Sequence, residues 1–450
     1  MLEKIFKLKD NKTTFQTEFV AGLTTFMAMS YIIFVNPTVL SQTGMDYNAV
    51  YGATILASIV GTLILALYAN VPYAQSAGIG LGSIFTYTLC GSMGYTWQQA
   101  LAMVFICSII NLTITLTSIR KKIIHAIPNF MQEAITVGIG LYITYIGLMN
   151  AGLISFKASE VSGGFAKDVI PQIATFNTPS VLLAIFGLLL AIILLVLKVK
   201  GAYLISIIVT TIVGLPLGVT DLPNFTNYTI LPSLSPTFMQ LDIIGLLTAK
   251  TGILIVLMTI FTLCISDLFD SIGIFIGTGK KSGIFKITKE NKLPKKLEKA
   301  LIADSSGSVV GSLLGTSNVT TYLESTAGIE AGGRTGLTSL FVALFFFLAL
   351  FLSPIIKIVP MEAVAPVLIL IGVSMIENIG SIDWKDIIIA VPAFFTVVLM
   401  PLSYSITTGI EIGFILFTII NYITGNKKEV SPIMAILTIL FIINFIFAAI

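Results

Sequence analysis

Long apolar runs, separated by short polar segments, follow one another along almost the whole chain. A helix that crosses the hydrocarbon core of a bilayer needs about 20 apolar residues, and most of these runs approach that length. The third and the tenth runs are shorter and rich in glycine. The pattern predicts fourteen membrane segments: 18–37, 48–69, 75–90, 97–118, 130–152, 178–197, 202–219, 251–279, 299–315, 319–331, 337–357, 362–380, 386–402 and 407–424.

Composition supports an all-α polytopic membrane protein. Of the 450 residues, 56% are hydrophobic and 10% are charged, which leaves too little polar surface for a soluble domain of this size. The N-terminus lacks the apolar region and the small-residue cleavage site of a signal peptide, so we expect the first span to be retained. A last apolar run at 432–450 has three open interpretations: a further span, a surface helix, or a helix packed against the bundle.

The basic residues predict the orientation of the chain. If the N-terminus is cytoplasmic, all but four of the 25 lysines and arginines fall on the cytoplasmic side, as the positive-inside rule requires. The exceptions are Lys157, Lys167, Lys250 and Lys357. We therefore expect a multi-pass protein of the cell (cytoplasmic) membrane with a cytoplasmic N-terminus. The formal net charge of +3 is too small to indicate a nucleic-acid partner.

Seven predicted segments lie on each side of the loop at 220–243, and an odd-numbered unit that is duplicated in tandem enters the membrane in opposite orientations. The fifth and twelfth segments share a glycine-punctuated pattern, as do the short third and tenth. We therefore predict a 7+7 inverted repeat. The divisions are a cytoplasmic N-terminus at 1–17, a first repeat at 18–219, an extracellular loop at 220–243, a second repeat at 244–424, and a basic linker with the C-terminal apolar segment at 425–450.

Three carboxylates stand out among those inside the apolar segments. Asp267 and Asp270 are spaced i, i+3 in the eighth segment and project from one helical face, and Glu324 lies in the short tenth segment. A charged group near the bilayer centre costs about 2.5–3.5 kcal/mol on insertion scales, so such residues usually line a substrate or ion pathway. Interrupted segments at matching positions of two repeats are typical of a transporter binding site. Close helix packing is the alternative explanation for their glycines.

Other classes of protein fit less well. The chain has one histidine and contains no HExxH or GxSxG motif, so nothing indicates a membrane-embedded enzyme. Cys90, Cys107 and Cys264 form no CxxC pair, and we expect no metal site, disulfide framework or cofactor. A channel would need a continuous polar path, whereas the acidic residues gather around two elements.

Four stretches resemble the motifs of one transporter family. They are GLTTFMAMSYIIFVNP at 22–37, SDLFDSIG at 266–273, ADSSGSVVGSLLGTSNVTTYLESTAGIEAGGRTGLTSL at 303–340 and MPLSYSITTGIEIGF at 400–414. Over nearly its full length, the chain resembles the hypoxanthine/guanine/adenine permease branch of the nucleobase:cation symporter (nucleobase-ascorbate transporter) superfamily. The resemblance implies the fold of the related uracil permease, with fourteen segments in two inverted repeats and short antiparallel strands in segments 3 and 10. Segments 1–4 and 8–11 would form a core, and segments 5–7 and 12–14 a gate that carries a homodimer contact.

The resemblance also implies roles for the carboxylates. Asp267 matches the acidic position that contacts the base, Glu324 matches the acidic position of the tenth segment, and Asp270 is similar to a residue implicated in coupling or in site architecture. We expect Glu324 to take up a proton outside and to release it inside. Two neighbouring carboxylates titrate together, however, so the reverse assignment of Asp267 and Glu324 is an open alternative. The other substrate-site candidates are Gly80, Gly82, Thr321, Phe26 and Phe85, with Tyr31 and Tyr322 as further stacking candidates.

One position departs from the family pattern. AGIGLG at 77–82 stands where the family reads PGMGLN, so Gly82 replaces an asparagine that would offer a base both a donor and an acceptor. The expected function is secondary active import of a purine nucleobase (adenine, guanine or hypoxanthine) by proton symport, with an elevator-like movement of core against gate. The alternatives are xanthine or uracil as cargo, an anion carried by the same fold, and sodium in place of the proton.

Three polar residues near the ends of segments receive more local interpretations. Asp304 and Arg334 are predicted to form a structural pair or to belong to a gate near the cytoplasmic face. Glu411, in the last segment, is predicted to make a packing hydrogen bond.

Overall fold

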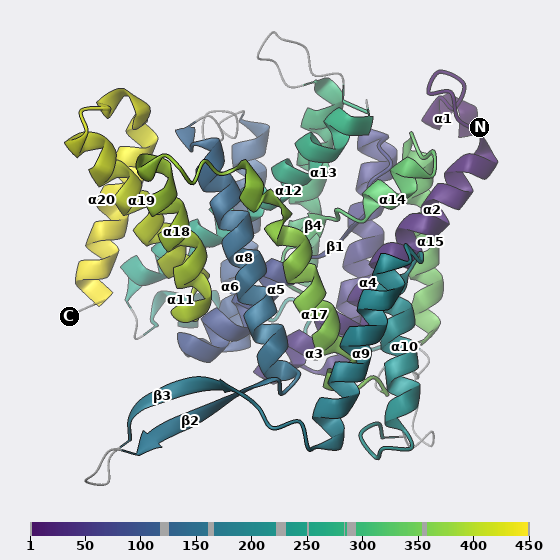
Figure 1. Cartoon of the computed structure of the whole chain (residues 1–450). Coiled ribbons are helices and arrows are strands. Elements are labelled where there is room, and N and C mark those ends of the chain that lie inside the picture. Colours follow the sequence, from purple (N-terminus) through teal and green to yellow (C-terminus); the bar gives the residue numbers. More distant parts are fainter. Residues whose placement is uncertain are drawn as a thin grey trace.

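The computed structural model describes residues 2–117, 126–160, 166–221, 231–249, 252–282, 284–285, 294–352 and 358–448. Most of its helices run between the two ends of a single bundle (Figure 1). The N-terminus lies at the upper end in that view, and a two-stranded hairpin projects from the lower end.

Four helices of the first half begin at polar capping residues. Thr14, Asp46, Thr96 and Thr178 each accept a hydrogen bond from a backbone N–H of the first turn, which satisfies a donor that the helix start leaves free. The helices are α1 (Leu2–Phe6), α2 (Phe15–Met29), α3 (Ile32–Leu40), α4 (Tyr47–Ile64), α5 (Ile79–Ser83), α6 (Trp97–Leu116), α8 (Asn129–Asn150), α9 (Pro179–Val196) and α10 (Ala202–Gly214).

Helices of the second half follow the same rule, with caps at Thr335, Asp386 and Ser405. They are α11 (Ile243–Leu247), α12 (Ile253–Ser282), α13 (Lys295–Leu314), α14 (Ser325–Glu330), α15 (Gly336–Ala349), α17 (Met361–Met375), α18 (Ile387–Leu402), α19 (Ile406–Ile423) and α20 (Pro432–Ala448).

Six helical stretches of the described chain are long and apolar enough to cross a membrane. They are Phe15–Thr43, Tyr47–Ala69, Trp97–Leu116, Pro179–Val196, Met361–Ser381 and Ile406–Ile423. Shorter apolar helices occupy Ala202–Gly214, Ile253–Leu268, Gly336–Leu352, Ile387–Leu402 and Pro432–Ile446. The apolar segments predicted from the sequence therefore coincide largely with helices, while the count of fourteen crossings and the inverted repeat stay predictions.

The first predicted segment is interrupted. α2 ends at Met29 and α3 begins at Ile32, whereas the sequence predicts one segment over 18–37. The Ser30 hydroxyl lies 3.4 Å from the Met27 carbonyl oxygen, and hydroxyl contacts with the preceding turn often bend helices. At the interruption, the side chain of Tyr31 is almost completely buried.

Two short strands lie in the third and tenth segments, where the resemblance predicts them. β1 (Gln75–Ala77) pairs antiparallel with β4 (Val319–Thr321), and Ser76 lies opposite Thr320. α5 follows β1 and continues as a π-helix over Ile84–Ser92, while α14 follows β4. The two interrupted segments therefore meet through their strands inside the bundle (Figure 1).

The fold is not entirely helical. β2 (Ile154–Glu160) and β3 (Ala166–Ile173) form an antiparallel hairpin at the end of the bundle opposite the N-terminus (Figure 1). The search for long apolar runs misses it, although ISFKASE at 154–160 alternates apolar and polar residues with the period of a strand. Lys157 and Lys167, two exceptions to the charge bias, belong to these strands, whereas Lys250 and Lys357 lie outside the described residues.

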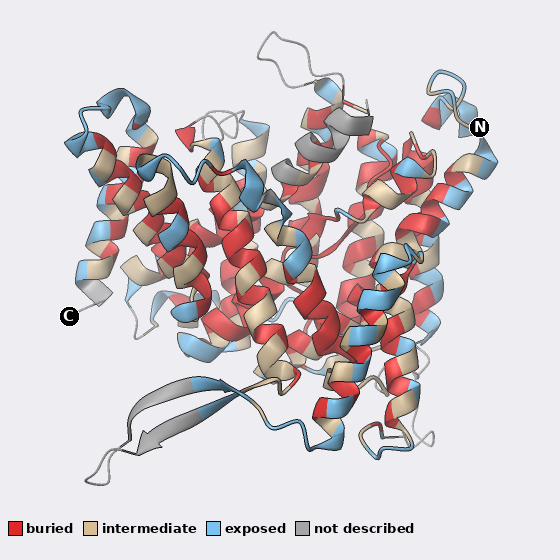
Figure 2. Cartoon of the chain, viewed as in Figure 1, coloured by how far each residue is buried: buried red, intermediate tan, exposed pale blue. Residues whose placement is uncertain are grey.

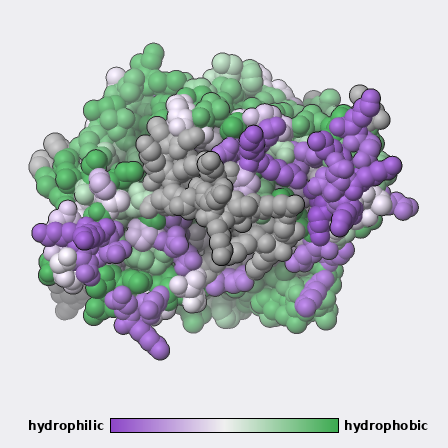
Figure 3. Space-filling view, turned by 90° about the horizontal axis from the view of Figure 1, so that it is seen from above, coloured by the Kyte–Doolittle hydropathy of each residue, from purple (hydrophilic) through white to green (hydrophobic). Residues whose placement is uncertain are grey.

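Burial follows the bundle. Buried side chains gather where helices face one another, and many outer faces are apolar and exposed (Figure 2). On α9, Leu189 and Ile193 are 54% and 55% exposed. Water does not favour so much exposed apolar surface, whereas lipid does. Seen from above, hydrophilic residues gather on this end of the molecule and hydrophobic residues lie around its flanks (Figure 3).

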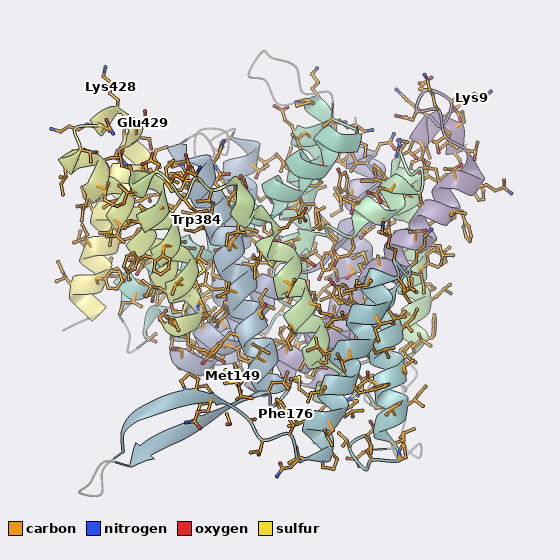
Figure 4. The ribbon with its side chains drawn as sticks, in the orientation of Figure 1. Lys9, Met149, Phe176, Trp384, Lys428 and Glu429 are labelled. Atoms are coloured by element: carbon orange, nitrogen blue, oxygen red, sulfur yellow. The ribbon has the colours of Figure 1, made fainter. Side chains whose placement is uncertain are left out.

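The labelled side chains mark the two ends of the bundle. Lys9, Lys428 and Glu429 lie at the upper end, while Met149 and Phe176 lie toward the lower end (Figure 4). Charged side chains at the end that holds the N-terminus agree with the sequence expectation, and the cytoplasmic assignment of that end stays a prediction.

The C-terminal apolar run forms a helix that packs against the bundle. The Phe441 ring of α20 lies 5.6 Å from the Phe414 ring of α19 and 6.1 Å from the Phe261 ring of α12. Asn444 Nδ2 donates to Glu411 Oε1 at 2.8 Å. The packing hydrogen bond predicted for Glu411 is therefore confirmed, and the helix at 432–448 packs against the bundle, while the interpretation as a further span stays a prediction.

Helix neighbours fall into two sets. α4 packs against α13 and α15, and α13 also packs against α6. α8 packs against α17 and α18, and α9 and α10 pack together beside α17. The division into core and gate stays a prediction.

Candidate functional site

A carboxylate from α13 holds the two paired strands together. Oδ1 of Asp304 accepts from the Thr321 backbone N–H at 3.0 Å, from the Thr321 hydroxyl at 2.8 Å and from Gln75 Nε2 at 3.3 Å. Gln75 belongs to β1 and Thr321 to β4, so one buried carboxylate bonds to both strands. Such a buried charge is tolerated because donors surround it.

The predicted pairing of Asp304 with Arg334 is wrong. The Arg334 guanidinium donates instead to the carbonyl oxygens of Ile329 and Gly333, at 2.6 and 2.7 Å. Its backbone N–H donates to Glu18 at 3.0 Å. The two residues were expected to meet because both border the tenth segment, but the strand contacts of Asp304 draw its carboxylate into the bundle.

Glu324 follows β4 and immediately precedes α14. Its Oε1 accepts a hydrogen bond from the Tyr31 hydroxyl, which reaches it from the interruption between α2 and α3. Tyr322, two residues before Glu324, donates a hydrogen bond from its hydroxyl to the Ala77 carbonyl oxygen of β1. Glu324 is half-buried, whereas both tyrosine rings are buried. Three elements that are far apart in sequence therefore position this carboxylate.

Asp270 of α12 lies in the same group. Its side chain lies beside Thr320 of β4, and its charged neighbours are Asp304 and Glu324. Asp270 is half-buried, as Glu324 is. The structure therefore brings together two half-buried acidic residues, Asp270 and Glu324, beside the paired strands.

Asp267 has different surroundings. It is only 3% exposed, and its Oδ2 accepts from Asn111 Nδ2 of α6 at 2.7 Å. Asn111 Nδ2 also lies 3.3 Å from the Cys264 carbonyl oxygen. A spacing of i, i+3 places Asp267 and Asp270 on adjacent parts of the α12 surface, but Asp267 contacts α6 while Asp270 contacts β4. Sequence reasoning missed Asn111, which lies in an otherwise apolar run and matches no motif.

The two site glycines face different neighbours. A Cβ atom at Gly80 would lie 3.1 Å from Ile139 Cγ2 of α8. A Cβ atom at Gly82 would lie 3.3 Å from Asn36 Oδ1 and 3.4 Å from Ser317 Oγ. The position of the missing asparagine is therefore directed at α3 and the start of β4.

The predicted stacking residues are packed. The Phe26 ring lies 5.5 and 5.3 Å from the rings of Phe345 and Phe346 in α15. Phe85 is completely buried in the main hydrophobic cluster. These contacts describe packing, and a role in substrate binding stays a prediction for both residues.

The arrangement offers hydrogen-bond acceptors. Among the described residues, no group of three or more His, Cys, Asp and Glu side chains could hold a metal ion. Two half-buried carboxylates can accept from N–H groups of a small ligand, and the ends of interrupted helices add backbone groups to such a site.

Interrupted helices that meet beside buried carboxylates, in a bundle with apolar outer faces, define a membrane transporter. The chain belongs to the Permease family (Xan_ur_permease), whose model matches residues 16–412. Its relatives are transporters, so it is a permease and not an enzyme.

Full-length relatives confirm the resemblance to purine permeases. A permease of Methanocaldococcus jannaschii is 43% identical over 447 residues, which cover 99% of this chain and 98% of that protein. The adenine permease AdeP of Escherichia coli is 38% identical over 447 residues, or 99% and 96% of the two chains. The guanine/hypoxanthine permease PbuG of Bacillus subtilis is 38% identical over 455 residues, or 99% and 100%.

Solved structures with a similar fold are also transporters. The transmembrane domain of the cyanobacterial bicarbonate transporter BicA superposes with a TM-score of 0.62 at 15% identity, covering 87% of this chain and 97% of that domain. SLC26A9 superposes with a TM-score of 0.61 at 12% identity, covering 91% and 65% of the two chains. Identities this low support the fold alone.

Proposed function

We propose that this permease imports a purine nucleobase (adenine, guanine or hypoxanthine) across the cell membrane. The proposal rests mainly on one observation. Asp270 and Glu324 are both half-buried and lie beside the antiparallel pair of β1 and β4. The names of the full-length relatives, which are adenine and guanine/hypoxanthine permeases, support the same class of cargo.

A purine is flat and uncharged, and donors and acceptors alternate along its edge. Carboxylates accept from its ring and exocyclic N–H groups, and backbone amides donate to its acceptors. Asp270 and Glu324 lie on different elements, so one base can bridge them. Asp267 remains a candidate base ligand of the same helix, and its bond to Asn111 would then hold the carboxylate in place.

Proton symport is part of the proposal. Burial in a low dielectric favours the neutral form of a carboxyl group, whereas access to water favours the ionised form. Glu324 would bind a proton from outside and release it inside as the core moves against the gate. Support comes from its half-buried position and from the Tyr31 hydroxyl, which stabilises the ionised form. We further propose a cytoplasmic N-terminus and a homodimer that contacts through the gate.

The charge of the site argues against an anion as the cargo. The fold is shared with a bicarbonate transporter, but a site that presents two carboxylates repels an anion. Xanthine and uracil also have N–H groups that can donate hydrogen bonds to the same carboxylates. These two bases are therefore the competing cargoes.

Uptake of radiolabelled adenine, guanine, hypoxanthine, xanthine and uracil by a permease-deficient bacterial strain tests the proposal. We expect saturable uptake of at least one purine that a protonophore abolishes. Glu324→Gln and Asp270→Asn should each lower this uptake at least tenfold, which corresponds to about 1.4 kcal/mol.

Glu411→Gln is the matched control, because it neutralises a buried carboxyl that bonds to Asn444 in α20. It should keep uptake within about twofold, the scale of a neutral hydrogen-bond change. Purine uptake that survives both site substitutions would contradict the assigned carboxylates. Bicarbonate or uracil uptake without any purine uptake would contradict the proposed cargo.

A further inference from the structure

Tyr203, near the start of α10, reaches the Glu324 region from the neighbouring set of helices. Its ring lies 5.2 Å from the Tyr31 ring at an interplanar angle of 80°. Tyr31 donates its hydroxyl to Glu324, and Tyr203 itself interacts electrostatically with Glu324. Tyr203 also lies near Ser374 of α17. No motif of the sequence singles out this residue.

Three tyrosines thus lie near one carboxylate, and they differ in how far each is exposed. Tyr31 and Tyr322 are 1% and 6% exposed, and their hydroxyls are bonded to Glu324 and to the Ala77 carbonyl. Tyr203 is only half-buried. Of the three tyrosines, Tyr203 is therefore the one that is not fully buried.

The turn before α10 fixes the position of this ring. Lys200 Nζ lies 3.4 Å from Thr24 Oγ1 of α2. Gly201 has a φ of +75°, and a Cβ atom there would lie 3.1 Å from the Met27 carbonyl oxygen. Only glycine adopts this conformation without strain while the backbone approaches α2 so closely. Tyr203, two residues later, is consequently held against Tyr31 at the interruption between α2 and α3.

We propose that Tyr203 stacks on the planar cargo bound at Glu324 and is a substrate-contacting residue supplied by α10. This inference rests on the proposed transport of a nucleobase. Bases stack readily on aromatic side chains because every base has a π-face. The carboxylates would read the edge of the base, and Tyr203 would cover one face.

Transport kinetics and binding test the proposal. Tyr203→Ala should raise the KM for purine uptake about tenfold while it changes the maximal rate less than about twofold, as expected for a lost stacking contact. Tyr203→Phe keeps the ring and should restore the wild-type KM. Tyr145→Ala is the matched control, because Tyr145 of α8 packs instead against Tyr404, at 6.4 Å between ring centroids.

Tyr203→Trp supplies an independent readout on purified protein. Its indole emission should change when the transported purine is added, and the purine should raise the melting temperature of the same variant. The proposal would be overturned if Tyr203→Ala left the KM unchanged. It would also be overturned if a purine raised the melting temperature of Tyr203→Trp without changing its indole emission. If no purine stabilises the wild-type protein, the transport proposal fails instead. The two failures are therefore distinguishable.

Discussion

The two interrupted segments share a topology and differ in chemistry. In the first, the polar side chains of β1 are buried and bonded internally: Ser76 contacts Ser58 at 2.6 Å between hydroxyl oxygens, and Gln75 contacts Asp304. In the second, Tyr322 and Glu324 follow β4 and face the first segment and α3. We therefore expect the first segment to act mainly as a backbone scaffold and the second to carry side chains that recognise a ligand.

In the predicted inverted repeat, the two halves would therefore contribute unequally to the proposed binding site. The glycines of the first segment allow close approach: a Cβ atom at Gly78 would lie 2.9 Å from Thr320 Oγ1. Thr320 in turn contacts Asp270. We therefore expect the first segment to affect the proposed binding site through β4. Selectivity for the cargo should depend on the second segment, α12 and α10.

The largest expected effect comes from removing the carboxylate that joins the segments. Asp304→Ala leaves the Thr321 N–H, the Thr321 hydroxyl and Gln75 Nε2 without their acceptor. Each buried group left unpaired costs about 1–3 kcal/mol, so we expect uptake to fall at least tenfold and the purified protein to melt several degrees lower.

Asp386→Ala is the control for this experiment. That carboxylate only caps α18, through the Ile388 N–H at 2.9 Å, and the loss of a cap costs about 1 kcal/mol. Uptake by Asp304→Ala at the level of Asp386→Ala would mean that the strands hold together without the carboxylate, and the scaffold interpretation would fail.

Gly78→Ala should have an intermediate effect. Its methyl group would press on Thr320 and displace the partner of Asp270, so we expect the KM for the purine to rise severalfold. A double-mutant cycle with Thr320→Ala measures the coupling, since contacting residues typically couple by about 0.5–3 kcal/mol. If the effects of Gly78→Ala and Thr320→Ala simply add, the first segment does not act through Thr320.

Much of this architecture could be predicted from the sequence, because long apolar runs and glycine-rich interruptions have local causes. The paired strands in 75–77 and 319–321 and the packing role of Glu411 agree with the structure. The hairpin of β2 and β3 was missed because its alternating pattern lies between two much stronger apolar signals.

The side-chain partners could not be predicted in the same way. Asp304 and Arg334 border one segment, yet their hydrogen bonds go to different parts of the bundle. Asn111 and Tyr203 lie in apolar helices far along the chain from Asp267 and Glu324, respectively. Such contacts depend on how helices rotate and cross, which spacing along one chain does not specify.

The smallest effect is expected at Gly82, where the family pattern has asparagine. Gly82→Ala adds a methyl group that faces Asn36, Ser317 and Leu40 at 3.3–3.5 Å. Small shifts accommodate such contacts, so we expect the KM to change less than about twofold. Gly82→Asn should keep the ranking of adenine, guanine and hypoxanthine in competition uptake, because its amide would be directed at Ser317 Oγ. A changed ranking would show that the first segment reads the base directly, and the contrast between scaffold and recognition segments would then have to be abandoned.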